Sequence, residues 1–136
     1  MKAFWINLPV KDVQKSVAFF IALGFKFNPS RAITEHSACL MAGNNQVVVM
    51  LFEETIFEGF TKQPLTDTAL STEVLFSLDV ESKEEVDLMA EKAVAAGGKC
   101  NHVPSAMEGW MYGCVFADID GHRWNIMYMD YSQMPQ

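Results

Sequence analysis

Side chains that bind metals or act in catalysis are few in this sequence and widely spaced. The three histidines are His36, His102 and His122, and none stands three or four residues from another candidate ligand on a predicted helix. That spacing favours surface or turn roles for them over metal ligation. Spacing alone also supports no Ser/His/Asp or Cys/His group, so nucleophilic catalysis has no candidate on this ground.

The cysteines also lack the number and the spacing of a functional cluster. Cys39, Cys100 and Cys114 make an odd number and contain no C-x-x-C pair. This usage favours reduced thiols in a reducing compartment over a disulfide framework. We therefore interpret all three as small core or near-surface residues.

One acidic motif near the end of the chain admits two interpretations. The residues Asp118–Gly121 read D-I-D-G, which begins like a calcium loop, but Met129 stands where such a loop has its bidentate glutamate. Aspartate and glycine also supply the side-chain hydrogen bonds and the positive φ that turns need, so a turn between strands is the favoured interpretation. G-x-G-x-x-G, Walker A, H-E-x-x-H and G-x-S-x-G motifs are all absent, which removes the reaction classes they serve.

Composition indicates one folded domain over residues 1–136. Half of the residues are hydrophobic and 20% are charged, unlike a disordered chain. The formal net charge of −7 repels phosphate backbones, so nucleic acid is excluded as an expected partner. Apolar runs such as Val17–Leu23 and Val47–Phe52 are far too short to span a membrane, and the N-terminus has no signal-peptide pattern. We expect a cytoplasmic protein without membrane contact.

The candidate side chains need elements to position them, and hydrophobic periodicity predicts a first module over about 1–53. A strand that Pro9 stops is followed by a helix, Val13–Leu23, which Asp12 caps and Gly24 ends. Three strands should follow, over Phe25–Asn28, His36–Ala42 and Gln46–Phe52.

The same order recurs in a second module over about 72–131, after a connection (54–71) that holds a short helical turn. A strand over Thr72–Val80 precedes a helix over Lys83–Ala96, and Ser82 with Glu85 predicts a capping box at its start. The further predicted strands are Lys99–Val103, Met111–Ala117 and Arg123–Met129.

A single module of about 60 residues buries too little surface to be stable alone, so we expect the two modules to pair. We expect an α+β fold in which two paired β-α-β-β-β modules form a curved mixed sheet around a concave cavity. With the helices on the outer faces, the opposite strand faces would line that cavity, where a small molecule would bind.

Two stretches resemble a known superfamily. They are S-V-A-F-F-I-A-L-G-F over Ser16–Phe25, preceded by L-P-V-K-D, and D-I-D-G-H-R-W-N over Asp118–Asn125. At this separation, and with the internal repeat, they resemble the vicinal oxygen chelate superfamily, which contains glyoxalase I, extradiol dioxygenases, and fosfomycin-resistance and bleomycin-binding proteins. The nearest branch is an uncharacterised bacterial one often labelled lactoylglutathione lyase-like, a family label that demonstrates no activity.

This resemblance implies four metal-ligand positions, one on the first strand and one on the last strand of each module. In this chain those positions are similar to Trp5, Met50, Glu73 and Asn125, and of these only Glu73 is a good ligand. We therefore expect no cofactor, and a divalent metal only if other donors rescue this degenerate site.

The cavity wall implied by strand alternation is mostly apolar with a few polar groups, as small-molecule sites are. Its expected ligand-binding residues are Trp5, Asn7, Met50, Phe52, Glu73, Leu75, Asn125 and Met127, with Val48 and Ser77 beside them. The competing interpretation is that the apolar members fill space between the sheets and the polar ones satisfy one another. Glu73 is the candidate catalytic or ligand-selecting group, expected in a space walled by Trp5, Met50 and Phe52. Alternatively, Glu73 is a structural carboxylate held by Asn125 or Arg123.

Three functions stay open at this point. The first is a metal-independent binding protein that sequesters or carries an amphipathic or aromatic small molecule. The second is a glyoxalase-like lyase or isomerase that uses a degenerate metal site or Glu73 as an acid/base. The third is a regulatory or scaffolding domain that acts through a dimer surface. The ten phenylalanines and nine methionines of a small domain also predict a homodimer, because they leave apolar surface to cover.

Overall fold

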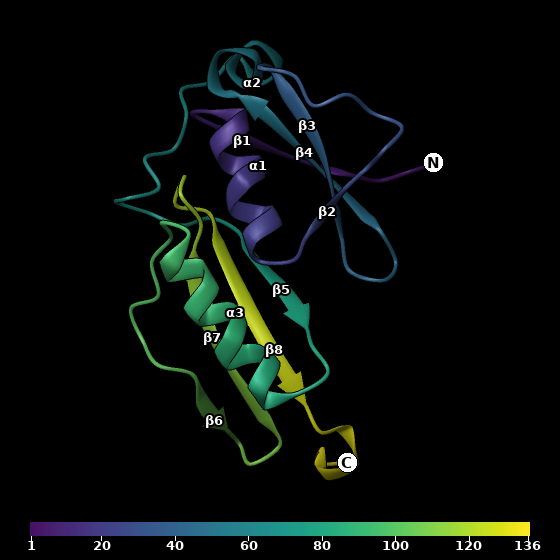
Figure 1. Ribbon diagram of the computed structural model, residues 1–136, viewed down its shortest axis with the longest axis vertical. Helices are drawn as coiled ribbons and strands as arrows, with labels where there is room; N and C mark the ends of the chain where they lie inside the picture. Colours follow the sequence, from purple (N-terminus) through teal and green to yellow (C-terminus); the bar gives the residue numbers. More distant parts are fainter. The chain divides into compact units, whose positions relative to one another are not determined.

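Each half of the chain folds in the order strand, helix, strand, strand, strand, as the computed structural model of residues 1–136 shows (Figure 1). Unit 1 spans Met1–Asp67 and unit 2 spans Thr68–Gln136, so the division falls within the predicted connection. The α+β class and the repeated β-α-β-β-β module are confirmed.

Unit 1 is a four-stranded sheet with two helices. Its elements are β1 (Ile6–Val10), α1 (Val13–Ala22), β2 (Lys26–Phe27), β3 (Ser37–Ala42), β4 (Val47–Glu53) and α2 (Glu54–Thr61). The strand order is β1-β4-β3-β2, with β1 parallel to β4 and the other pairs antiparallel. Helix α1 packs on β3 and β4 and covers one face of the sheet (Figure 1).

The first strand does not stop at Pro9, contrary to our prediction. It continues to Val10, and Pro9 lies opposite Phe52 of β4. Because β1 is the edge strand of its sheet, the proline's missing N–H removes no bond from a ladder on its far side. This edge position is what lets a proline sit inside the strand.

Helix α1 ends, as predicted, at Gly24. The amide of Gly24 donates to the carbonyl of Ile21 at 3.0 Å, and the amide of Phe25 donates to Phe20 at 2.9 Å. This is the Schellman pattern, and it requires the positive φ of +94° that Gly24 adopts. At the other end, the Asp12 carboxylate accepts the Lys15 amide at 3.0 Å, as expected for an N-cap.

Unit 2 repeats this arrangement and ends in a 3-10 turn. Its elements are β5 (Leu75–Asp79), α3 (Lys83–Ala95), β6 (Ser105–Met107), β7 (Met111–Ala117), β8 (Arg123–Met129) and η1 (Tyr131–Gln133). The strand order is β5-β8-β7-β6, with only β5 and β8 parallel. Helix α3 packs across β7 and β8 (Figure 1). No helix in the chain combines the length and apolar character that crossing a bilayer requires.

Ser82 caps α3 as predicted, but the reciprocal half of the capping box differs. The Ser82 hydroxyl accepts the Glu85 amide at 3.1 Å. The Glu85 carboxylate accepts the amide of Glu81 at 2.8 Å, one residue before the expected partner. The same helix terminus is stabilised, because a backbone donor of the entering chain is still satisfied.

In unit 2, two predicted strands are shorter or displaced. The predicted strand Thr72–Val80 begins only at Leu75, because its single neighbour β8 begins at the facing Arg123. The predicted strand Lys99–Val103 is wrong: only Lys99 pairs, with Ala117, and the strand proper is β6. Residues 100–104 lie against only residues 114–116 of β7, so the chain bulges and cannot keep the ladder register there.

The core of unit 2 lies between α3 and its sheet. Trp124 and Phe116 stack with parallel rings at 6.5 Å, and both are buried. Small residues of α3, Ala90 and Ala93, are buried as well, so the helix approaches these large rings closely.

Candidate ligand-binding faces

Each sheet presents one face that its long helix does not cover, and on unit 1 we call it face A. The side of the sheet that α1 covers holds Leu8, Val10 and Leu51, which are at most 7% exposed. The residues of face A alternate with these along the strands and therefore lie on the other side. On the other side Asn7 lies directly opposite Met50. Face A consists of Asn7, Pro9, Lys26, Ser37, Cys39, Met41, Val48, Met50 and Phe52.

Two aromatic side chains mark the ends of face A. Trp5 lies just before β1 and is 53% exposed. Phe52 packs edge to face on Phe60 of α2, with ring centroids 5.0 Å apart. Helix α2 therefore borders the end of face A opposite Trp5, and the indole is available for stacking.

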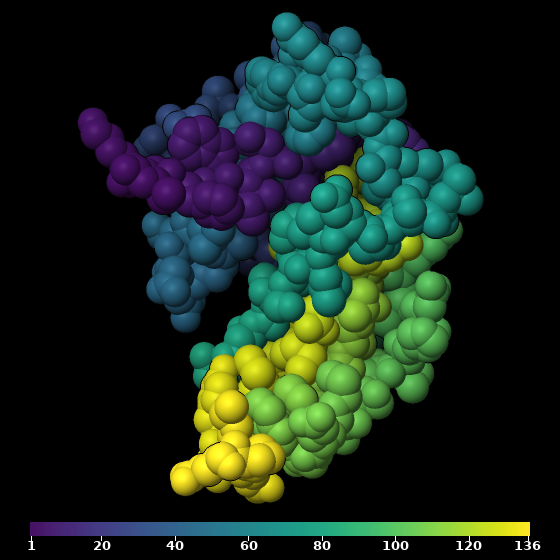
Figure 2. All heavy atoms as spheres, turned by 180° about the vertical axis from the view of Figure 1, so that it is seen from behind, coloured from purple at the N-terminus to yellow at the C-terminus, as the bar shows by residue number.

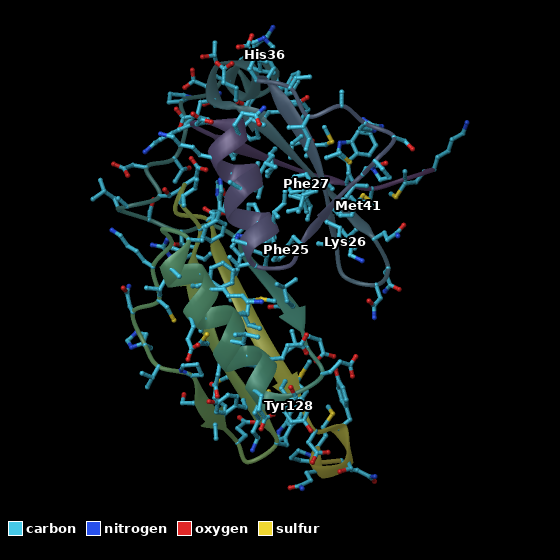
Figure 3. The ribbon with its side chains drawn as sticks, in the orientation of Figure 1. Phe25, Lys26, Phe27, His36, Met41 and Tyr128 are labelled. Atoms are coloured by element: carbon cyan, nitrogen blue, oxygen red, sulfur yellow. The ribbon has the colours of Figure 1, made fainter.

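Sulfur atoms occupy the middle of face A and one cation lies at its β2 edge, an arrangement that sequence alternation alone had not assigned. The Cys39 thiol lies 4.0 Å from the Met41 thioether, and Cys39 faces Met50 across the β3–β4 ladder. Lys26 faces Met41 across the β2–β3 ladder, where the two side chains lie near each other (Figure 3). The pairing of strands, which the sequence pattern does not give, brings these residues together.

The corresponding surface of unit 2, face B, is the side of its sheet away from α3. The Tyr112 hydroxyl donates to the Asp87 carboxylate of α3 at 2.5 Å, so the alternate residues Gly113 and Val115 point away from the helix. Face B consists of Leu75, Ser77, Asp79, Met111, Gly113, Val115, Arg123, Asn125, Met127 and Met129. Figure 2, seen from behind, brings atoms of β8 (yellow) and β7 (yellow-green) into view.

Face B holds three of the predicted ligand-binding residues, and a close contact fixes one of them. The Asn125 amide donates to the Ser77 hydroxyl at 3.2 Å across the parallel β5–β8 pair. Met127 lies over Gly113, because a Cβ at Gly113 would stand 2.5 Å from the Met127 sulfur. Leu75 is 51% exposed at the start of β5. Together they form an apolar surface with one polar pair.

Glu73 stands two residues before β5 and is exposed. It makes no hydrogen bond or ion pair with either suggested holder. Asn125 bonds to Ser77 instead, and the Arg123 guanidinium donates to the carbonyls of Gly121 and, at 3.4 Å, of Thr68. The structural alternative for Glu73 therefore lacks the contacts it requires, and its carboxylate is available to a ligand.

The most buried carboxylate of the chain, Asp118, belongs to the turn before β8. Its side chain accepts the amides of Asp120 at 2.9 Å and His122 at 3.0 Å, and the Trp124 indole N–H at 3.0 Å. Burial raises the pKa of the Asp118 carboxyl above its ordinary value, although His122 and the indole hydrogen bond oppose the rise. The predicted turn at 118–121 is confirmed, and these contacts assign Asp118 to structure.

The histidines lie outside both faces. His36, at the α2 end of unit 1 (Figure 3), contacts the carboxylates of Glu53 at 3.0 Å and Glu35 at 3.2 Å. His122 belongs to the Asp118 turn through its amide, and His102 is an exposed loop residue whose carbonyl accepts the Cys100 thiol. All three have the surface or turn positions that their spacing indicated.

The residues at the four implied ligand positions do not fit a divalent metal. Trp5 offers no lone pair for coordination, the Met50 thioether is a soft and weak donor, and Asn125 offers only a neutral amide oxygen. Within either unit, no three histidine, cysteine, aspartate or glutamate side chains form a group that could hold an ion. Glu73 alone does not make a metal site, so no chemical step is assigned to a metal here.

Comparison with known proteins agrees with this geometry. The family model described as Glyoxalase/Bleomycin resistance protein/Dioxygenase superfamily matches residues 2–126. A hypothetical protein, SA1046 from S. aureus, is 36% identical, with a TM-score of 0.83 over 94% of both chains.

More distant solved structures share the fold. A glyoxalase/bleomycin resistance protein/dioxygenase family enzyme from Burkholderia phytofirmans PsJN is 19% identical, with a TM-score of 0.77 over 93% of this chain and 97% of that one. The fosfomycin resistance protein FosX from Listeria monocytogenes is 17% identical, with a TM-score of 0.66 over 97% and 96%. No curated protein matches the sequence.

Proposed function

The chain belongs to the Glyoxalase/Bleomycin resistance protein/Dioxygenase superfamily, and on that premise we propose that it binds an amphipathic or aromatic small molecule without a metal ion. The observation that carries this proposal is the loss of donors at the implied ligand positions, where Trp5 and Met50 stand in place of metal-binding side chains. A tryptophan there retains binding area while abolishing coordination.

The composition of the two sheet faces supports binding. Small-molecule sites combine apolar walls with a few polar groups that fix orientation. On face A, Asn7 lies beside Met50, and on face B the polar pair of Asn125 and Ser77 has the apolar residues Leu75 and Met127 beside it. We propose that Trp5, at one end of face A, stacks on aromatic groups and that Glu73, just before β5 of unit 2, pairs with cationic or hydrogen-bond-donating groups.

Two aromatic dyes of opposite charge test this function. Ethidium presents a cationic aromatic surface and 8-anilinonaphthalene-1-sulfonate an anionic one. We expect saturable binding of ethidium, tighter than that of the sulfonate, because the chain carries a formal net charge of −7 and Glu73 is exposed. Trp5→Ala should weaken ethidium binding about tenfold, or about 1.4 kcal/mol.

A neighbouring substitution provides the control. Phe4 is 77% exposed and adjacent to Trp5. Phe4→Ala removes a similar exposed aromatic area, so it should leave the ethidium affinity within about twofold of wild type. Equal losses in the two variants would show non-specific adsorption of dye and would refute the assignment of Trp5.

The alternative is a glyoxalase-like lyase or isomerase, which the single retained acid, Glu73, favours. That chemistry needs an ion to stabilise an enediolate and a carboxylate to move the proton. We expect little or no turnover of the hemithioacetal of methylglyoxal and glutathione, even with added nickel or zinc. Turnover of ordinary enzymatic size that a chelator removes and the ion restores would establish the alternative.

Homodimer formation and a cytoplasmic location are further parts of the proposal. The homodimer is supported by apolar side chains that a second copy of the chain would cover. Among them are Phe4, Leu70 and Val103, each more than 75% exposed. Sedimentation at tens of micromolar protein tests the dimer, and a single monomer species would contradict it.

A further inference from the structure

Two thiols that are distant in the sequence lie side by side in unit 2, away from both ligand-binding faces. Cys114 belongs to β7, where alternation with Tyr112 places its side chain on the α3 side, and it is 8% exposed. Cys100 lies in the segment that follows α3 and is partly exposed.

Backbone pairing brings Cys100 against β7. The backbones of Lys99 and Ala117 exchange two hydrogen bonds, of 2.9 and 2.7 Å. Because Ala117 is the last residue of β7, Cys100 lies next to the end of that strand. The Cys100 thiol donates to the carbonyl of His102 at 3.1 Å and lies 3.6 Å from the carbonyl of Val115, the residue after Cys114. Alternation from Lys99 turns Cys100 to the same side of the sheet as Cys114.

The two thiols also interact with each other. Burial raises the pKa of the Cys114 thiol to about 12, and the neighbouring Cys100 raises it further through its charge and a hydrogen bond. Cys114 therefore stays protonated, whereas Cys100 is the more accessible of the pair. Accessibility is what an incoming oxidant requires of the first sulfur to react.

We propose that Cys100 and Cys114 are a redox-active thiol pair that hydrogen peroxide, or a peroxide of the same class, converts to a disulfide. The Cys100 thiolate attacks one peroxide oxygen, the O–O bond breaks, and the released hydroxide takes up a proton to become water. Cys100 is then a sulfenic acid. The Cys114 sulfur displaces the sulfenic hydroxyl, the S–S bond forms, and the thiol proton leaves with that hydroxyl as a second water. Two thiols are oxidised and one peroxide is reduced.

The bulge in the chain gives this pair the freedom to close and to reopen. Residues 100–104 belong to no strand, since the ladder is interrupted between Lys99 and β6. A disulfide prefers Cα atoms about 4.4–6.8 Å apart. Because residues 100–104 lie outside the ladder, the backbone at Cys100 can adjust to that separation, and a disulfide that is accessible at Cys100 is readily reduced.

Thiol counting and peptide mapping on the full chain test the proposal. After treatment with one equivalent of hydrogen peroxide, wild type should lose two free thiols, its mass should fall by that of two hydrogen atoms, and digestion should yield a peptide that joins Cys100 to Cys114. Dithiothreitol should restore both thiols. Cys39→Ser is the matched control, because Cys39 is a buried thiol of unit 1, and it should behave as wild type does.

Two further variants separate the steps. Cys100→Ser should abolish the thiol loss, and Cys114→Ala should leave a Cys100 sulfenic acid that dimedone traps. The wild-type peptide map is decisive even if Cys114→Ala folds poorly. A cross-link that contains Cys39, cross-links only between chains, or unchanged thiols at a peroxide dose that oxidises glutathione would each overturn the assignment.

Discussion

The indole N–H of Trp124 donates a 3.0 Å hydrogen bond to the carboxylate of Asp118, and both side chains are at most 5% exposed. The bond joins the turn before β8 to the strand's most deeply buried ring. Since the same carboxylate also accepts the amides of Asp120 and His122, one acidic side chain closes the turn and fixes where β8 begins. Strand β8 carries Asn125 and Met127, so this turn helps to position face B.

Removing that carboxylate should destabilise the protein. Asp118→Ala leaves three donors without an acceptor, and we expect the free energy of unfolding to fall by about 2–4 kcal/mol. Urea denaturation followed by tryptophan fluorescence measures it. The control is Asp130→Ala, a half-buried turn aspartate that accepts from Ser132, which should cost less than about 1 kcal/mol. Similar losses at both positions would contradict the role assigned to Asp118.

The raised pKa of Asp118 predicts a pH dependence of defined sign. A carboxyl whose pKa is higher in the folded than in the unfolded protein contributes stability below the ordinary value of 3.8, and that contribution is lost as pH rises through the folded pKa. Asp118→Asn does not titrate, so the unfolding free energy of wild type minus that of the variant should fall as pH rises from about 4 toward neutral. A difference that grows over this range would show a lowered pKa.

The close contact at Gly113 predicts an intolerance that another glycine lacks. A Cβ at Gly113 would stand 2.5 Å from the Met127 sulfur and would also collide with the Ile126 carbonyl, so Gly113→Ala should cost about 1–3 kcal/mol. Gly59, inside α2, has no atom within 4 Å of its would-be Cβ, so Gly59→Ala should stabilise by about 0.5–1 kcal/mol. Thermal melts of the two variants should shift in opposite directions. A neutral Gly113→Ala would contradict the close approach of the Ile126 carbonyl and the Met127 sulfur to Gly113.

Much of this architecture follows from local pattern. The strands Met111–Ala117 and Arg123–Met129, the caps at Asp12 and Ser82, and the helix end at Gly24 all agree with the structure. Each depends on residues close together in the sequence, where hydrophobic alternation and capping chemistry act directly.

What the pattern missed depends on pairing between distant strands. We predicted a strand over Lys99–Val103, but β6 takes the edge of β7 and leaves most of those residues in a bulge. The sulfur cluster of Cys39, Met41 and Met50 likewise exists only once β3 lies against β4. Strand register decides which residues of different strands face one another, and the pattern of a single sequence specifies that register only weakly.

Glu73 provides the sharpest test of how a ligand would be selected. Glu73→Gln keeps the side-chain shape and removes the charge, so the melting temperature should stay nearly unchanged, because Glu73 is exposed and neither Asn125 nor Arg123 holds it. The affinity for ethidium should fall about tenfold, about 1.4 kcal/mol, while that for 8-anilinonaphthalene-1-sulfonate should not fall. Glu91→Gln, on an exposed position of α3, is the charge-matched control. A stability loss with unchanged affinity would make Glu73 a structural residue.

The measurement that bears most directly on the central claim is an ethidium binding isotherm recorded on the purified chain before chelation, after exhaustive chelation, and again after one equivalent of zinc is added. Metal-independent binding predicts one saturable isotherm with the same Kd in all three conditions, since Trp5 and Met50 supply no coordination that an ion would complete. Binding that disappears on chelation and returns with zinc, or no saturable binding in any condition, would contradict the account.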